Sequence, residues 1–237
     1  MSKNGVQLYN EGYCYYKGCN GYPMNYCKAF DLFTKAAELG NSDAMNYLGL
    51  MYENGEGTIQ DAQKMVYWFN RSASLNDVWG LYNLGRCFGS GNGVVSDINK
   101  ALELCLRSYS LEKNSSVGEY LGYIYYDLGN YRECAKYLLA VRDYVDNPNG
   151  LYIIGWLFES GHSSVTGIRD RQMMAMKYYE KSANKGVPEG MYAYGKLLLN
   201  IDKNQAGTAR YWIKKAAQLG NADAKSLLKW INLQRFI

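Results

Sequence analysis

The sequence has no long hydrophobic run and no secretion signal at its start. Its first residues, "MSKNGVQLYNEGY", are polar and rich in tyrosine instead of basic and then apolar. No apolar run approaches the roughly 18–20 residues that a membrane-spanning helix needs. We therefore expect no membrane insertion and a cytoplasmic location, or a secreted or periplasmic one if a leader precedes this sequence.

Clustered positive charge and paired cysteines are also missing. The net charge of +4 is spread along 237 residues, with no group of Lys and Arg that would neutralise several phosphates, which argues against nucleic acid as a partner. The six cysteines never form the C-x-x-C pairs on which zinc and redox sites rely. With no phosphate loop or cofactor motif either, we expect no metal and no cofactor. We expect six reduced thiols, buried or partly exposed, at Cys14, Cys19, Cys27, Cys87, Cys105 and Cys134.

Histidine is nearly absent, and no set of residues points to catalysis. The single histidine, His162, lies in the stretch "SGHSS", and no cysteine occurs from residue 149 onward. A nucleophile needs a base within hydrogen-bond reach, so we expect a solvated loop residue here. Asp61, Asp97 and Asp170 each precede an expected helix, where a carboxylate caps backbone N–H groups. The sequence predicts no catalytic residue.

What the sequence does contain is a repeat. Glycines flanked by large apolar residues recur in steps of 37, 36, 37, 33 and 40 residues, at Gly12, Gly49, Gly85, Gly122, Gly155 and Gly195. A second marker runs in phase with them, from "KAFDLFTKAA" at residue 28 to "TARYWIKKAA" at residue 208. A fixed period of this length is typical of solenoid proteins.

Each repeat carries the pattern of two amphipathic helices. Ala44, Leu48 and Met51 lie on one stripe of a helix, and Met65 and Phe69 begin the same pattern in the next one. Loop glycines in "YENGEG" and "FGSGNG" end the first helices, where the chain must turn. A glycine inside a helix costs about 1 kcal/mol relative to Ala, so the five repeat glycines from Gly49 to Gly195 indicate close approach of a neighbouring helix.

These patterns predict one all-α domain over residues 1–237. The expected fold is a right-handed α/α solenoid of six helix-turn-helix repeats followed by a C-terminal capping helix. The repeats are expected at residues 5–40, 41–77, 78–114, 115–148, 149–188 and 189–223, and the capping helix at 224–237.

The pattern "LG..Y..G.G" followed by "D..KA..W..KAA..G" resembles the Sel-1-like repeat (SLR) family, which is related to the tetratricopeptide repeats. The second and third repeats match best; the fourth, "YLGYIYYDLGNYRECAKYL", lacks the Gly-x-Gly loop, and the fifth carries a longer loop, "ESGHSSVTGIRDRQ". The resemblance implies a non-catalytic scaffold or adaptor that binds another protein. The alternative is a small-molecule-binding or β-lactam-hydrolase-like enzyme of the cysteine-rich SLR branch, but that branch carries a regular cysteine in each repeat.

The many tyrosines concentrate at three positions of the first helix in each repeat. Counted from the repeat glycine, positions −3, +1 and +4 share one strip, and nine of its eighteen residues are Tyr or Trp. Either the rings fill the inner side of a curved solenoid, or they form a concave groove that binds a peptide or protein segment. The predicted partner-binding residues are Tyr9, Tyr13, Tyr16, Tyr82, Arg86, Tyr123, Tyr126, Tyr152, Trp156, Tyr192 and Lys196.

Four of these residues, Tyr123, Tyr126, Tyr152 and Trp156, come from adjacent repeats and are expected to form one patch. Arg86 and Lys196 flank it in the sequence, which favours an acidic segment as the partner. The chain itself is expected to be a monomer or to associate weakly.

Overall fold

The computed structural model describes residues 3–164 and 167–233, and all regular elements in that part of the chain are helices. This confirms the all-α fold class. The helices are α1 (Gly5–Lys17), α2 (Tyr26–Glu38), α3 (Ser42–Asn54), α4 (Ala62–Ser74), α5 (Val78–Ser90), α6 (Ile98–Leu111), α7 (Ser115–Asp127), α8 (Tyr131–Ala140), α9 (Pro148–Glu159), α10 (Ile168–Asn184), α11 (Pro188–Ile201), the short 3-10 helix η1 (Lys203–Gln205), α12 (Ala206–Gln218) and α13 (Ala222–Leu233).

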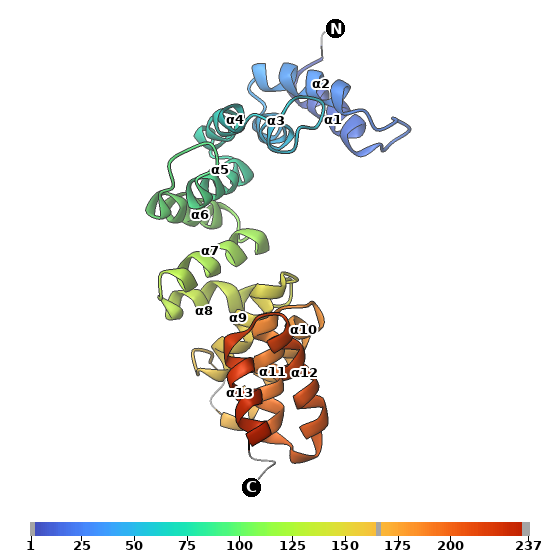
Figure 1. Cartoon of the computed structure of the whole chain (residues 1–237). Coiled ribbons are helices and arrows are strands. Elements are labelled where there is room, and N and C mark those ends of the chain that lie inside the picture. Colours follow the sequence, from blue (N-terminus) through green and yellow to red (C-terminus); the bar gives the residue numbers. More distant parts are fainter. Residues whose placement is uncertain (1–2, 165–166, 234–237) are drawn as a thin grey trace. The chain divides into compact units, whose positions relative to one another are not determined.

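The chain divides into two compact units, Met1–Val117 and Gly118–Ile237. In the first, α1 packs with α2, α3 with α4 and α5 with α6; in the second, α9 packs with α10 and α11 with α12 (Figure 1). Gly122 of α7 lies against Leu138 of α8, so this pair packs in the same way. The helix pairs coincide with the six expected repeats. The single continuous domain stays a prediction.

The repeat glycines lie where two helices of a pair come closest, as the sequence predicts. A Cβ atom at Gly49 would lie 2.4 Å from the Phe69 ring, and one at Gly85 would lie 2.6 Å from Cys105 Sγ. Both distances are far below van der Waals contact. Glycine is therefore required at these positions by packing, which offsets its low helix propensity.

Aspartate caps explain where several second helices begin. Asp61 accepts hydrogen bonds from the backbone N–H groups of Gln63 and Lys64 at the start of α4, and Asp97 does the same at the start of α6. Both predicted caps are confirmed. The cap predicted at Asp170 is wrong, because α10 already begins at Ile168, which places Asp170 inside its first turn. The long loop expected in this repeat is shorter for the same reason: its last five residues, "IRDRQ", are helical.

Each unit has its own apolar core, formed by buried side chains of its helices. In the first unit, Phe33, Leu48 and Met51 are fully buried. In the second, one cluster extends from Cys134 to Ala224, and Leu227 and Leu228 of α13 pack against it. Helix α13 begins two residues earlier than the expected 224–237, and residues 234–237 lie outside the described part of the chain.

Candidate binding surfaces

The predicted partner-binding residues all lie on the first helices of their repeats, and they share an intermediate exposure. Ten of the eleven side chains are half-buried, and Lys196 is exposed. A half-buried ring packs one face against the core and leaves another face accessible. The strip is therefore neither a sealed core nor a set of freely solvated side chains.

A hollow of about 360 Å³ in the second unit gathers four of these residues. Tyr152 and Trp156 come from α9, and Tyr192 and Lys196 come from the neighbouring first helix α11. The other lining residues are Glu159, Ser160, Tyr179, Glu189, Ala193, Asn221 and Asp223. Tyr126 touches Trp156 from outside the lining, with ring centroids 5.7 Å apart.

The rings of this hollow are fixed by their neighbours. Trp156 packs edge-on against Tyr131, at 4.7 Å between centroids, and stacks on His162 at 5.3 Å. Tyr152 lies 5.8 Å from the buried ring of Tyr179, whose hydroxyl donates a hydrogen bond of 2.6 Å to Glu159. Burial raises the pKa of Tyr152 to about 12, so its hydroxyl is a neutral donor at physiological pH. The aromatic wall is thus preorganised.

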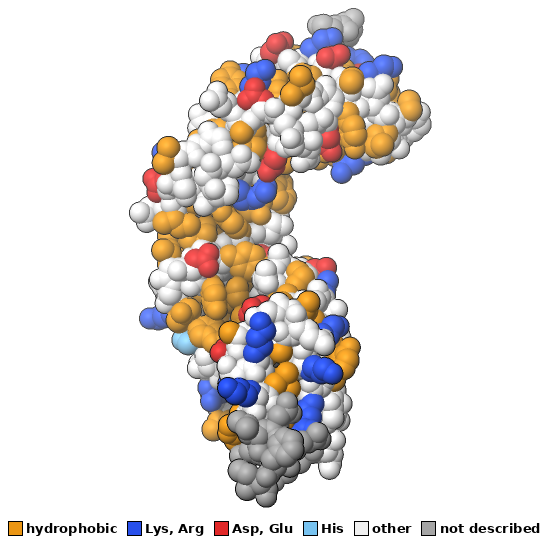
Figure 2. Space-filling view, in the orientation of Figure 1, with side chains coloured by type: hydrophobic (Ala, Val, Ile, Leu, Met, Phe, Trp, Pro, Cys, Tyr) orange, Lys and Arg blue, Asp and Glu red, His pale blue; other side chains and the backbone are white. Residues whose placement is uncertain are grey.

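The charge of this lining is the reverse of what the sequence led us to expect. Three carboxylates, on Glu159, Glu189 and Asp223, surround the hollow, against the single ammonium of Lys196. The other flanking cation, Arg86, belongs to the first unit and pairs with Glu53 at 3.5 Å. A surface with more carboxylates than cations favours a basic ligand over an acidic one. In Figure 2, hydrophobic side chains gather over α7 and α8, whereas basic side chains are scattered over α11 to α13.

The first unit contains a second hollow, of about 340 Å³, beside α1, α3 and α5. Two predicted residues, Tyr9 and Tyr82, line it. The remaining lining residues are Asp43, Asn46, Tyr47, Leu50, Trp79 and Asn83. Tyr47 lies at the centre of a cluster of aromatic side chains, because its ring centroid is within 6 Å of the ring centroids of Tyr9, Tyr13 and Tyr16. Burial raises the pKa of Tyr47 to about 12, and burial and the charge of Asp77 raise the pKa of the Asp43 carboxyl.

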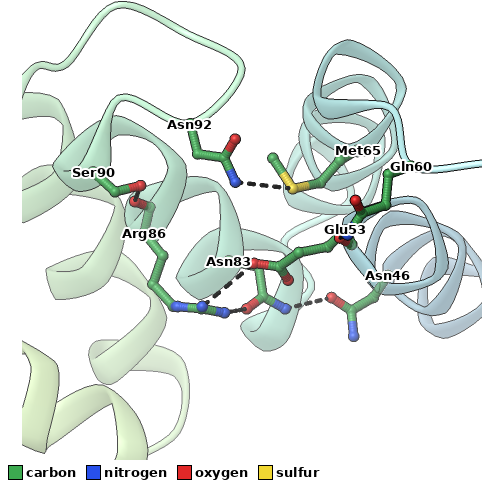
Figure 3. Close-up of polar contacts among 8 residues, drawn as sticks. All are labelled: Asn46, Glu53, Gln60, Met65, Asn83, Arg86, Ser90 and Asn92. Carbon is green, nitrogen blue, oxygen red and sulfur yellow. Dashed lines mark hydrogen bonds and ion pairs between the residues drawn. The ribbon is translucent and has the colours of Figure 1, made fainter. Parts of the chain in front are cut away.

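A network of polar side chains includes two residues that line this hollow, Asn46 and Asn83 (Figure 3). Arg86 donates from Nη1 to Asn83 Oδ1 at 3.1 Å, and Asn83 donates from Nδ2 to Asn46 Oδ1 at 2.8 Å. The two asparagines are almost completely buried, at 6% and 5% exposure for Asn46 and Asn83. Buried amides joined in this way have a fixed orientation.

The patch expected from Tyr123, Tyr126, Tyr152 and Trp156 is brought together only in part. Tyr152 and Trp156 share the second-unit hollow and Tyr126 contacts Trp156. Tyr123 is not part of that lining; its hydroxyl is hydrogen-bonded to Glu119. A Cβ atom at Gly150 would meet the Tyr123 hydroxyl at 2.2 Å, so that hydroxyl faces the start of α9.

Several residues of the two hollows were not selected from the sequence. Asn46 and Glu159 occupy strip positions −3 and +4, so the repeat register itself could have identified them. Tyr47 and Tyr179 lie at other positions in their helices, and Asp223 belongs to α13. Nothing in the strip pattern points to these three.

The one histidine, His162, contacts a serine of the same loop. Ser160 Oγ lies 2.8 Å from His162 Nδ1 and also donates to the backbone oxygen of Trp156 at 2.6 Å. Within residues 3–164 and 167–233, no group of three or more His, Cys, Asp or Glu residues is placed to hold a metal ion.

Two further sequence-based expectations concern membranes and thiols. Among the described helices, none has the length and apolar character needed to cross a bilayer. All six cysteines are free: Cys87, Cys105 and Cys134 are buried, and the other three are at least partly exposed. Burial raises the pKa of the Cys105 and Cys134 thiols to about 12.

Comparison with known proteins agrees with the repeat architecture. The chain is similar to a Sel1 repeat protein from Oxalobacter formigenes, with a TM-score of 0.68 and 24% identity over 90% of this chain and 85% of that one. It is also similar to c5321, a protective antigen of uropathogenic Escherichia coli strains that displays an SLR fold, with a TM-score of 0.67 and 24% identity over 97% of this chain. The chain spans 57% of the length of that antigen. No curated protein matches the sequence significantly.

The sequence model of the Sel1 repeat matches five segments, at residues 8–41, 42–77, 80–112, 148–187 and 188–221. The unmatched stretch between residues 112 and 148 contains the fourth repeat, which lacks the Gly-x-Gly loop. These segments cover most of the chain, and their boundaries follow the helix pairs. The chain belongs to the Sel1 repeat family.

Proposed function

We propose that this chain is a non-catalytic interaction scaffold whose first-helix faces bind a segment of another protein. Sel1 repeat proteins are generally protein-interaction scaffolds. The observation that carries the proposal for this chain is the second-unit hollow, where Tyr152, Trp156 and Tyr192 are half-buried around about 360 Å³ of space. Tyr and Trp supply large contact area at low entropic cost and dominate binding hot spots.

The partner segment that fits this hollow carries a basic side chain. The carboxylates of Glu159, Glu189 and Asp223 attract a Lys or Arg side chain, and the accessible face of an aromatic ring stabilises the cation by about 0.5–1 kcal/mol at an exposed site. The charge complementarity contributes mainly to specificity and to the association rate.

The proposal is tested by separating binding from stability. A partner is first captured from native lysate, and its binding segment is mapped. Tyr126, Tyr152, Trp156 and Tyr192 are then replaced one at a time by alanine. Loss of a partly exposed ring changes stability by less than about 1 kcal/mol, whereas loss of a hot-spot contact weakens binding by at least about 2 kcal/mol. We expect the largest loss of affinity for Trp156→Ala.

A matched control is available on α13. Trp230 is 55% exposed and lies outside the hollow, so Trp230→Ala should leave the affinity unchanged. Glu159→Gln keeps an acceptor for the Tyr179 hydroxyl but removes a negative charge. The variant should bind the partner more weakly, and its affinity should change less with salt concentration than that of the unaltered protein. Unchanged binding in all four alanine variants, or unfolding of all four, would contradict the proposal.

A further inference from the structure

The hollow of about 340 Å³ in the first unit combines aromatic rings with a carboxylate that has no counter-ion. Its four aromatic side chains are Tyr9, Tyr47, Trp79 and Tyr82. Asp43 supplies the carboxylate, and no Lys or Arg is among the described residues of the lining. Asp43 forms no ion pair with any other described residue. Burial and the charge of Asp77 raise the pKa of Asp43, as expected where no cation offsets the two carboxylates.

One cation lies beside this hollow, on Arg86, but its charge is already offset. Its guanidinium carbon lies 5.9 Å from the centre of the Tyr82 ring. Arg86 Nη2 lies 3.5 Å from Glu53 Oε1, and Nη1 donates to Asn83 Oδ1 at 3.1 Å (Figure 3). Because Arg86 pairs with Glu53, the carboxylate of Asp43 is left to attract a cation from outside the chain.

Trp79 gives this hollow an accessible aromatic ring. It is 39% exposed, and it packs edge-on against Tyr82 with 6.0 Å between ring centroids. In the part of the chain that the structure describes, no Lys or Arg lies over the Trp79 ring. A similar edge-on pair holds a guanidinium elsewhere in this unit, where the Arg71 guanidinium carbon lies 5.1 Å from the Trp68 ring and 5.9 Å from the Tyr67 ring. A Tyr–Trp pair at this spacing therefore accommodates an arginine side chain.

An arginine fits this hollow better than a lysine does. A guanidinium is planar and weakly hydrated, so it stacks on an aromatic face while its N–H groups bind a carboxylate through two parallel hydrogen bonds. An ammonium is more strongly hydrated and has no flat face to stack. A volume of about 340 Å³ lies near the lower end of the roughly 300–1,000 Å³ of ligand pockets, which leaves room for one side chain.

We propose that the first-unit hollow binds the side chain of an arginine in a segment of a partner protein. The guanidinium stacks on the Trp79 ring and is bound by the Asp43 carboxylate. The inference rests on the proposed function, because it concerns how the scaffold recognises a protein segment. It adds a second anchor point, in a different unit from the hollow around Trp156, and it names the residue type that this anchor takes.

The probe is N-acetyl-arginine N-methylamide, and its matched reference is the citrulline analogue, in which a neutral urea replaces the guanidinium at nearly the same shape. The full chain is labelled with 5-fluorotryptophan, so each of its five tryptophans is followed separately by fluorine NMR. The variants Trp79→Phe and Trp156→Phe assign the two resonances of interest. We expect a saturable shift of the Trp79 resonance with the arginine probe, and an affinity several-fold lower for the citrulline analogue and for the lysine analogue.

The carboxylate is tested with Asp43→Asn, for which Asp31→Asn is the control. Asp31 is exposed on α2 in the same unit and lies outside the lining of the hollow. At low salt, Asp43→Asn should bind the arginine probe about two- to five-fold more weakly than the unaltered chain, whereas Asp31→Asn should bind it equally well. Added salt should reduce the difference between the two variants.

A Trp79 resonance that does not respond, or that responds equally to the arginine and citrulline probes, would overturn the inference even if Asp43→Asn failed to fold. Equal affinity for the lysine analogue, or an undiminished affinity of folded Asp43→Asn, would overturn it as well. The Trp156 resonance reports the second-unit hollow in the same titration. Failure at Trp79 alone therefore leaves the proposed function standing, and failure of the Trp156→Ala binding experiment leaves the Trp79 titration decisive.

Discussion

Replacing Gly195 by alanine should destabilise the second unit, although alanine is the better helix former. In a helix with free space, this change stabilises the protein by about 1 kcal/mol. At Gly195, however, a methyl group would lie 2.7 Å from Ile213 Cγ1 and 2.8 Å from the backbone oxygen of Ala209. Because that oxygen belongs to the backbone of α12, the clash is relieved only if α11 and α12 move apart.

The size of the effect follows from these two contributions. Overpacking of a well-packed interior costs about 1–3 kcal/mol, and contact with backbone places this site in the upper part of that range. Subtracting about 1 kcal/mol of helix propensity leaves a net destabilisation of about 1–2 kcal/mol. For a chain of this length, that corresponds to a fall in Tm of about 2–8 °C.

Gly207 on α12 is the matched control, because a Cβ atom built there has no neighbour within 4 Å. Gly207→Ala should therefore stabilise the protein, by about 0.4–1 kcal/mol. Urea denaturation followed by circular dichroism measures both variants against the unaltered chain. If Gly195→Ala were as stable as Gly207→Ala, the close approach of α11 and α12 could not be the reason for the repeat glycine.

Three further predictions concern caps, pH and thiols. Asp61→Ala removes a cap that accepts two backbone N–H groups and should cost about 1 kcal/mol in thermal or urea denaturation, whereas Asp170→Ala, which removes no cap, should cost less than about 0.5 kcal/mol. Burial raises the folded-state pKa of Tyr152 to about 12, whereas the unfolded pKa is about 10. The resulting contribution to stability is fully present below about pH 10 and is lost as the pH rises toward about 12. In urea denaturation between these pH values, the Tyr152→Phe variant should therefore lose less stability with rising pH than the unaltered protein. A thiol reagent should label three cysteines in the native protein and six after denaturation, because Cys87, Cys105 and Cys134 are buried. Labelling of more than three cysteines in the native protein would contradict the burial of these three side chains between the helices.

The repeat architecture was determined by the sequence alone, because it depends on local patterns. The periodic glycines, the amphipathic stripes and the caps at Asp61 and Asp97 act within one helix or between adjacent helices, and all of them are found where the sequence predicts. The half-buried state of the Tyr-rich strip follows from the same register. The error at Asp170 also has a local cause: nothing in the sequence showed that "IRDRQ" would extend α10 toward its N-terminus.

The composition of each hollow was decided only by tertiary structure. Glu159, Glu189 and Asp223 come from three different helices, so the negative charge around Trp156 appears only when α9, α11 and α13 are placed together. The strip pattern contained Lys196 and Glu159, but not Glu189 and Asp223, which make carboxylates the majority charge. A repeat period fixes which face of a helix is turned inward, but it does not fix which side chains from other helices meet there, because that depends on the packing distance and rotation of each helix pair.

The orientation of Asn46 is the clearest case of the same limit. Its position in the strip could be read from the sequence, but the orientation of its side-chain amide could not. The direction of its amide depends on Asn83, and the direction of Asn83 depends on Arg86, which is 40 residues away from Asn46 in the sequence. Sequence determines that a donor and an acceptor are present at this position; the contacts across α3 and α5 decide that the acceptor faces Asn83.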